Sequence, residues 1–319
     1  MSANYMLAYN AGIIASFSLS LLLLVTLYIK IPYDWWRRSH KLMGVVFFIA
    51  LVHALLISSQ MGTDYWLKIY YALWGIAALT TFFYRVVFAR VLVVRKKYRL
   101  EKVSNLPGKV TALSLSPTEG GIRFKPGQFV YVNFAPGQGQ KTEQHPFSVA
   151  SAPNEKNLRL YIKQLGNFTN KLPELKSGLN VEVEGAFGSF GDMTNGRRPQ
   201  IWIAGGIGVA PFLSLARSMN ENSPAVDMFY SVNTKDELLD QELLGGFLPK
   251  HFKNFRYFPF INDQHKGFLD LAFIASKAGD PAGRDIFICG PPPMMKALKA
   301  QLRAAGIPPR RIFTEEFSL

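Results

Sequence analysis

The apolar residues of this chain gather in three long segments within roughly its first ninety positions. The segments are Ala11–Ile29, Leu42–Ile57 and Leu67–Phe88. The first and third reach the ~20 residues that a helix needs to span a bilayer, and the second does so if its helix extends from His40 to Ser59. No positive charge precedes the first segment and no small-residue cleavage site follows it, which argues against a signal peptide. The pattern predicts three transmembrane helices.

Beyond these segments the hydrophobic pattern changes twice. Short alternating strands separated by Gly and Pro come first, typical of a small antiparallel barrel; they are Lys109–Ser114, Phe129–Phe134, Leu158–Lys163 and Val181–Glu184. Strands then alternate with helices, which predicts a doubly wound parallel sheet: Ile201–Ala204 with a helix from Pro211, Ala225–Tyr230 with one from Lys235, and Asp285–Cys289 with one from Pro293. The predicted domains are 1–97 (helices), 98–198 (β-barrel) and 199–319 (α/β).

Basic residues predict how the helices are oriented in a membrane. The first loop carries Arg37 and Arg38, Ser58–Tyr65 has no basic residue, and a basic run follows Arg90. Because basic loops stay on the cytoplasmic side, the N-terminus is expected outside the cell and the domains after Arg90 in the cytoplasm. The predicted location is therefore the cell membrane, with several passes through the lipid bilayer.

Charge and cysteine content exclude other kinds of partner and site. The net charge is +14, but no Lys/Arg-rich block is interleaved with aromatic residues, so no nucleic-acid partner is expected. Cys289 is the single cysteine, which excludes an intramolecular disulfide and a Cys-cluster metal site built by this chain alone. The basic residues beside the apolar segments account for much of the excess charge.

A glycine turn opens the predicted α/β domain. Gly205, Gly206 and Gly208 follow the buried strand Ile201–Ala204, and Pro211 begins the next helix. Such a turn lets backbone N–H groups approach the pyrophosphate of a dinucleotide, which a helix N-terminus favours. A tight strand-to-helix turn with no ligand is the alternative interpretation.

Five short motifs follow one another in a characteristic order. They are Pro126-Gly-Gln-Phe129, His145-Pro-Phe-Ser148, Gly205-Gly-Ile-Gly208 with Ala210-Pro211, Cys289-Gly-Pro291 and Glu316-Phe317. In this order they resemble the ferredoxin-reductase-like dehydrogenase domains. The His-Pro-Phe version is similar to that of the NADPH oxidase and ferric reductase transmembrane family. This resemblance covers the whole region after the helices and implies that the barrel binds FAD and the α/β domain binds NADPH or NADH.

The resemblance also implies a role for each matching residue. Ser148 would lie beside the flavin N5, and Phe317 would cover one flavin face and move aside for nicotinamide. The other implied flavin contacts are His145, Pro146, Phe147, Tyr161, Lys163, Gly166 and Thr169. The implied nicotinamide dinucleotide contacts are Gly205, Gly206, Gly208, Cys289, Gly290 and Pro291. A plain core role is the alternative for Cys289. The sequence lacks the arginine that in this family often binds the 2′-phosphate of NADPH. Ser231 and Lys235 could bind this phosphate instead, so NADPH is favoured and NADH stays open.

Two histidines lie on the second predicted membrane helix. An ionisable residue inside a membrane is a functional hypothesis by default, and His40 and His53 are ~20 Å apart along a helix. The resemblance implies that they ligate two haem b groups, although thirteen residues turn through ~220° and separate their faces. The family usually has six membrane helices, and these three match its last three. The chain would then be a truncated product or fragment of a six-helix protein, or a second copy or another subunit would supply the partner ligands. Interfacial or helix-packing histidines are the alternative.

The resemblance predicts a membrane NAD(P)H oxidoreductase. Hydride would pass from NAD(P)H to FAD, and single electrons would pass through haem to oxygen, giving superoxide, or to ferric iron. The main alternative is a haem-free, membrane-anchored flavin reductase that feeds a separate partner protein. A non-catalytic subunit that uses the domain for assembly or nucleotide sensing is a third possibility.

Overall fold

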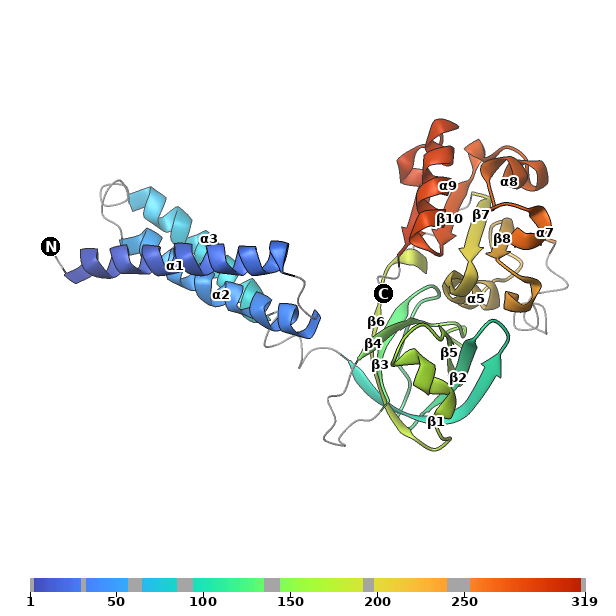
Figure 1. Cartoon of the computed structure of the whole chain (residues 1–319), viewed down its shortest axis with the longest axis horizontal. Helices are drawn as coiled ribbons and strands as arrows, with labels where there is room; N and C mark the ends of the chain where they lie inside the picture. Colours follow the sequence, from blue (N-terminus) through green and yellow to red (C-terminus); the bar gives the residue numbers. More distant parts are fainter. Residues whose placement is uncertain are drawn as a thin grey trace. The chain divides into compact units, whose positions relative to one another are not determined.

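The computed structural model forms two compact units that meet in sequence between Val93 and Val94. It describes residues 3–29, 33–56, 65–84, 94–134, 144–191, 198–239 and 253–316. Figure 1 shows a helical first unit and a second unit in which a barrel is followed by an α/β domain. The second unit holds both of the predicted nucleotide sites.

Three helices make up the first unit: α1 (Ala3–Tyr28), α2 (Tyr33–Leu56) and α3 (Tyr65–Phe83). Residues without bulk let them approach closely, because Gly44 lies against the ring of Phe82 and Gly75 against the side chain of Leu51. Within the described residues, Tyr5–Tyr28 and Ser39–Leu56 are long and apolar enough to cross a membrane. The described part of α3 does not meet that criterion. Two of the three predicted spans are therefore supported by length and composition among the described residues.

The barrel consists of six antiparallel strands. They are β1 (Arg95–Leu106), β2 (Val110–Pro117), β3 (Phe129–Asn133), β4 (His145–Ser148), β5 (Leu158–Lys163) and β6 (Asn180–Phe187). Their order is β4-β3-β6-β1-β2-β5, and a bridge between Val149 and Leu160 joins the two ends of this sheet. In β1, Tyr98 and Leu100 are buried between charged neighbours, which is the alternation expected of a strand with one solvent-exposed face.

The α/β domain is built on a five-stranded parallel sheet. Its strands are β7 (Gln200–Gly205), β8 (Val226–Val232), β9 (Phe255–Ile261), β10 (Asp285–Cys289) and β11 (Ile312–Glu315), in the order β11-β10-β7-β8-β9. Helix α5 (Ala210–Arg217) packs on one face, and α8 (Leu271–Ala278) and α9 (Pro292–Ala304) pack on the other (Figure 1). Parallel strands covered on both faces explain why β7 and β8 are buried throughout.

One predicted helix takes another form. A helix was expected from Lys235, but the described residues there make only a 3-10 turn, η5 (Lys235–Glu237), and residues 240–252 lie outside the described part. The strands β9 and β11 were not predicted. β9 contains Pro259 and β11 spans only Ile312–Glu315, so neither stands out as a hydrophobic run.

The barrel and the α/β domain share one hydrophobic core. Ala150 and Tyr161 of the barrel are buried in the same cluster as Trp202 of β7 and Phe212 of α5. A hydrogen bond of 2.7 Å from the Ser214 hydroxyl to the Ser151 carbonyl oxygen adds a polar link. The two domains therefore behave as one body in which each fixes the other's position.

A buried carboxylate ties the amino ends of the sheet strands together. The Asp227 side chain in β8 is 4% exposed and accepts two hydrogen bonds from Arg256, of 2.6 and 2.7 Å. Arg284, just before β10, donates to the same carboxylate. One negative charge thus holds two guanidinium groups at the edge of the sheet opposite the strands' carboxyl ends.

Neutralising this carboxylate is expected to destabilise the fold. Asp227→Asn leaves two guanidinium groups facing each other beside a neutral buried amide, and the expected loss is about 3 kcal/mol of unfolding free energy. Chemical denaturation measures it. The matched control is Asp236→Asn on the exposed turn η5, which is expected to stay within about 0.5 kcal/mol of wild type. Equal stability of the two variants would contradict the assigned role.

Candidate functional site

The order in which the chain adds strands to the parallel sheet reverses between β7 and β10. β8 lies on one side of β7 and β11 on the far side of β10, so the connections from these two strands leave in opposite directions. In sheets of this kind a ligand binds in the crevice at the carboxyl ends of the two strands. Gly205 ends β7 and Gly290 follows β10, and a Cβ on Gly290 would lie 3.0 Å from the Gly205 backbone. Only glycine permits this approach.

The glycine turn after β7 has the shape that a dinucleotide pyrophosphate requires. Gly206 has φ of +52°, and no heavy atom of the described residues lies within 4 Å of the place that its Cβ would take. The turn then runs through a 3-10 segment into α5, with Pro211 in its first turn. The open side of Gly206 leaves room for a ligand against the backbone, so the turn fits the pyrophosphate.

Gly208 and Pro291 have packing roles at the same crevice. A Cβ on Gly208 would lie 2.3 Å from the Cys289 carbonyl oxygen, and Pro291 Cδ lies 2.9 Å from the Cβ position of Gly205. The structure thus brings together Gly205, Gly206, Gly208, Cys289, Gly290 and Pro291, all of which the sequence assigned to the dinucleotide. Gly208 acts by letting the turn rest on β10, and direct contact with a dinucleotide stays a prediction for all six.

Cys289 is a buried, protonated thiol. It is wholly buried in the core that the barrel and the sheet share, and this burial, with a smaller contribution from the Glu315 charge, raises the pKa of the thiol far above its usual range. A thiol in this state is not a nucleophile. The plain core role fits these observations, and a contact with nicotinamide through its small size stays a prediction.

Glu315 is a site residue that the sequence did not single out. It pairs with Cys289 across β10 and β11, and burial raises the pKa of its carboxyl group. Its Oε1 lies 3.7 Å from the Cβ position of Gly188, which also touches the ring of Phe129. The near-terminal acid in the sequence motif was Glu316, but that side chain is 3.7 Å from Lys299 and mostly exposed. Phe317 lies outside the described residues.

Ser148 ends strand β4 of the barrel. It pairs with Phe129 in the β3–β4 ladder and is 7% exposed. Its hydroxyl makes no hydrogen bond to another described residue. Alternation along β4 places Pro146 on the exposed side and packs Phe147 near Phe134. Ser148 therefore fits a polar atom of a flavin ring.

His145 packs against the loop that carries Gly166 and Thr169, both of which are predicted flavin contacts. Its ring stacks on Phe168 with centroids 3.8 Å apart. In the same loop the Thr169 hydroxyl accepts a 2.8 Å hydrogen bond from the Leu165 amide, and Gly166 has open space where a Cβ would be. The Thr169 hydroxyl donates to no described residue, so its proton is available to a phosphate oxygen. Strand β4 and this loop form a cradle that fits FAD.

Tyr161 and Lys163 make contacts between the barrel and the α/β domain. Both lie on the face of β5 opposite the barrel interior. Tyr161 is buried in the core between the domains, and its hydroxyl lies 3.5 Å from the Arg217 guanidinium. Lys163 pairs with Glu237 of the α/β domain at 3.4 Å. These contacts join the two domains; a contact of either side chain with flavin stays a prediction.

The carboxyl end of β8 carries an acidic residue where a ribose is expected. Glu237 Oε2 accepts a 3.1 Å hydrogen bond from the Asn233 amide. Ser231, which the sequence assigned to a 2′-phosphate, is buried, and its hydroxyl donates to Asn262 Oδ1 at 3.1 Å. Its one proton is therefore already in use. Lys235 is exposed at the start of η5 and is the assigned residue left for a phosphate.

The membrane-helix histidines are the other predicted site. His53 lies 2.7 Å, through Nδ1, from the Ala8 carbonyl oxygen, and its ring fills the space beside Gly12 of α1. This geometry fits the helix-packing interpretation. Among the described residues no group of three or more His, Cys, Asp or Glu side chains could hold a metal ion. Haem ligation by His40 and His53 therefore stays a prediction.

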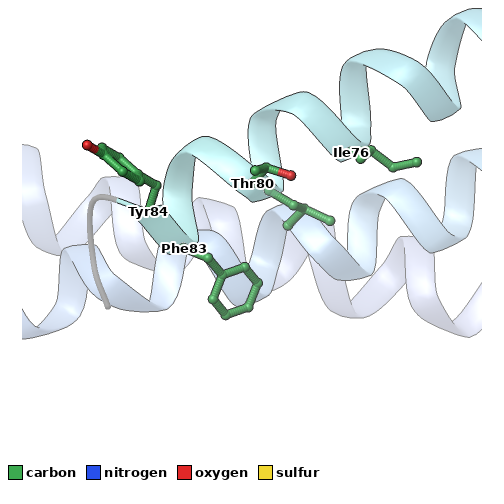
Figure 2. Close-up of a pocket in the computed structure, with 5 residues that line it drawn as sticks. Ile76, Thr80, Phe83 and Tyr84 are labelled. Carbon is green, nitrogen blue, oxygen red and sulfur yellow. The ribbon is translucent and has the colours of Figure 1, made fainter. Parts of the chain in front are cut away.

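A shallow hollow lies on the outer face of α3. Figure 2 shows that its walls come from α3 and the residue that follows it, and they are Ile76, Leu79, Thr80, Phe83 and Tyr84. Thr80 and Tyr84 give it two hydroxyl groups, and its described lining includes no charged side chain. It has no element in common with the glycine turn or the flavin cradle.

Comparison with known proteins agrees with the two nucleotide sites. A family described as an FAD-binding domain matches residues 95–208, and one described as an oxidoreductase NAD-binding domain matches residues 202–300. The anthranilate 1,2-dioxygenase electron transfer component of Acinetobacter baylyi is 31% identical over 208 residues, 61% of this chain and 59% of that protein. The NADH–cytochrome b5 reductase 1 of Arabidopsis thaliana is 28% identical, over 68% of this chain and 83% of that protein.

Solved structures share the fold of the second unit. The crystal structure of an Amycolatopsis cytochrome P450 reductase superposes with a TM-score of 0.61 and 24% identity over 71% of each chain. This chain spans about six tenths of the length of the dioxygenase component that it matches. These relatives are reductases and electron transfer components. They do not support the narrower resemblance to NADPH oxidases and ferric reductases.

Two glycine variants separate ligand approach from packing. Gly206→Ala meets open space but adopts a left-handed conformation, so it should fold with an unfolding free energy lowered by about 1 kcal/mol. Its KM for NAD(P)H should rise roughly tenfold, equivalent to ~1.4 kcal/mol. Gly208→Ala meets the Cys289 carbonyl and should lose ~1–3 kcal/mol of stability. Thermal unfolding and steady-state kinetics measure both; the reverse pattern would exchange the two roles.

Proposed function

Because the chain carries the FAD- and NAD-binding module of the ferredoxin reductase family, we propose that it is an NADH-dependent flavin reductase that passes electrons to a separate protein. The observation that carries this proposal is the meeting of two edges: Glu315 Oε1, at the end of β11, lies 3.7 Å from the Cβ position of Gly188, and the ring of Phe129, the strand partner of Ser148, lies 3.2 Å from the same position. A flavin, when bound, supplies the conversion of a two-electron hydride into single electrons.

The residues around this meeting point position the reactants. The open turn at Gly206 receives the pyrophosphate, and the lack of a side chain on Gly205 and Gly290 lets the ends of β7 and β10 pack closely beside it. The Ser148 hydroxyl offers a hydrogen bond to the flavin ring. Glu315, the pKa of whose carboxyl group is raised by burial, lies at the same edge of the site. Holding the two reacting groups in this geometry would lower the entropic part of the barrier to hydride transfer from the nicotinamide to the flavin.

The acceptor is proposed to be a separate protein rather than oxygen or ferric iron. The relatives include electron transfer or reductase components of anthranilate 1,2-dioxygenase and propane 2-monooxygenase, whose names describe proteins that serve an oxygenase. This supports the same division of labour here. It favours the haem-free alternative that the sequence left open.

The helical unit is proposed to anchor the reductase in the cell membrane. Phe17 and Leu21 of α1 and Trp74 of α3 are all more than 60% exposed, and such surfaces are covered by lipid or by a partner. The basic residues that follow the third apolar segment favour a cytoplasmic position for the barrel and the α/β domain. An anchor of this kind would confine the reductase to the surface where a membrane-bound acceptor lies.

One observation favours a second candidate, in which haem carries electrons across the membrane. If the His53 Nδ1 proton is donated to the Ala8 carbonyl oxygen, Nε2 keeps its lone pair, and metal-bound histidines are commonly oriented in this way. A haem held here would need a second axial ligand from outside the described residues or from another chain. The acceptor would then be oxygen or ferric iron.

Spectroscopy and turnover of the purified full chain test the proposal. In detergent the protein should show flavin absorbance that NADH bleaches, and it should reduce ferricyanide, a one-electron acceptor, without a Soret band. Failure to bind FAD, even on reconstitution, would contradict the proposal. A Soret band that disappears in His53→Ala would replace it with the haem-linked candidate.

The choice of NADH rests on Glu237. In sheets of this type an acidic residue after the second strand accepts a hydrogen bond from the ribose 2′-hydroxyl, whereas a cation near it accommodates a 2′-phosphate. The Glu237 carboxylate occupies that place and would repel the phosphate of NADPH. The exposed Lys235 is the one assigned cation nearby, and the Ser231 hydroxyl is already bonded to Asn262.

Removing this charge is expected to relax the preference. Glu237→Gln keeps the shape of the side chain, and it should raise kcat/KM for NADPH relative to NADH roughly tenfold, equivalent to ~1.4 kcal/mol. Asp236→Asn removes a neighbouring exposed charge and serves as the control. Steady-state kinetics with both nucleotides provide the ratio. A ratio that is the same in wild type and Glu237→Gln would remove this residue from the nucleotide site.

A further inference from the structure

We propose that Lys163, on the FAD-binding barrel, is a positioning residue for the adenosine end of the dinucleotide, because it holds Glu237 in the orientation that reads the ribose. This inference rests on the proposed function, in which Glu237 reads the ribose, and it deepens it by assigning part of nucleotide recognition to the other domain.

The Lys163 ammonium group bridges two domains. It donates a 2.6 Å hydrogen bond to the Gly108 carbonyl oxygen, in the turn between β1 and β2, and lies 3.4 Å from Glu237 Oε1 in the turn η5. The side chains of Lys163 and Glu237 are each about one-quarter exposed, at 25% and 26%. Because one ammonium group serves both a barrel carbonyl and a carboxylate of the α/β domain, it fixes the carboxylate relative to the barrel.

The β1–β2 turn is shaped for this contact. Gly108 and Lys109 have φ of +68° and +55°, and a Cβ on Gly108 would lie 2.9 Å from the Glu237 Cα. The hairpin backbone therefore rests directly on the backbone of η5. A side chain on Gly108 would push the two apart and carry the carboxylate away from the lysine.

Glu237 in turn organises the loop at the carboxyl end of β8. Its second carboxylate oxygen, Oε2, accepts a 3.1 Å hydrogen bond from the backbone N–H of Asn233. The side-chain Oδ1 of Asn233 in turn accepts a 2.9 Å hydrogen bond from Asn262 Nδ2. Asn262 also accepts from Ser231. Since the lysine binds Oε1 and the loop binds Oε2, the barrel sets the angle at which this loop meets a ribose.

Two other roles for Lys163 make different predictions. A direct flavin contact, which the family resemblance implies, predicts that its removal lowers FAD content. A plain ion pair between domains predicts lower thermal stability with unchanged nucleotide affinity. A positioning role predicts weaker binding of the adenosine end at normal FAD content.

The test compares four variants of the full chain with wild type. They are Lys163→Met, Lys163→Arg, Gly108→Ala and the exposed-lysine control Lys156→Met. The readouts are FAD content, KM and kcat for NADH, and the Kd for ADP-ribose by calorimetry. ADP-ribose carries the adenosine end without nicotinamide, so its affinity is measurable in a protein that transfers no electrons.

Lys163→Met and Gly108→Ala are expected to raise the Kd for ADP-ribose and the KM for NADH at least fivefold, with kcat within twofold and FAD content unchanged. Lys163→Arg should recover most of the affinity, and Lys156→Met should match wild type. Loss of FAD in Lys163→Met, or a lower melting temperature with unchanged Kd, would overturn the inference. A wild-type chain that binds ADP-ribose but does not oxidise NADH would contradict the proposed function and leave these affinity comparisons valid.

Discussion

The contact between Gly205 and Gly290 is the constraint on which the rest of the site depends. These residues stand at the carboxyl ends of adjacent parallel strands, and their backbones come so close that a Cβ on Gly290 would lie within 3.0 Å of Gly205. This packing lets the turn at Gly206 open toward a ligand while Gly208 rests on the Cys289 carbonyl. The Met294 side chain packs against both glycines, since its Cε lies 2.7 Å from the Cβ position of Gly205 and 2.6 Å from that of Gly290.

A shared core converts two nucleotide-binding domains into one body. Tyr161 lies in that core with Phe212 and Trp202, and the Lys163–Glu237 pair extends the interface toward the adenosine end. Hydride transfer requires two reacting groups to be held within a fraction of an ångström of a productive distance. A rigid interface meets this requirement without a hinge, and it gives the barrel a means of shaping nucleotide recognition in its neighbour.

The helical unit follows a different packing rule from the rest of the chain. Its helices approach through Gly12, Gly44 and Gly75, against the side chains of His53, Phe82 and Leu51. Small residues at helix contacts are favoured where water does not drive association, and the exposed apolar side chains of α1 and α3 agree with that setting. His53 serves this packing through its hydrogen bond with Ala8, which explains its presence without requiring a metal.

The sequence by itself determined the features that local pattern encodes. Glycine spacing predicted the open turn at Gly205–Gly208, and alternating residues predicted β2, β3, β5 and β6. The flavin contacts of Ser148 and Thr169, which the family resemblance implies, stay a prediction. It missed β9 and β11, whose residues become strand only beside an existing sheet. The tertiary structure alone decided what Tyr161, Lys163, Glu237 and Glu315 contact. The physical reason is that strand periodicity fixes which residues share a face, whereas the domain covering that face comes from distant sequence: Gly108, Lys163 and Glu237 meet only after both domains have packed together.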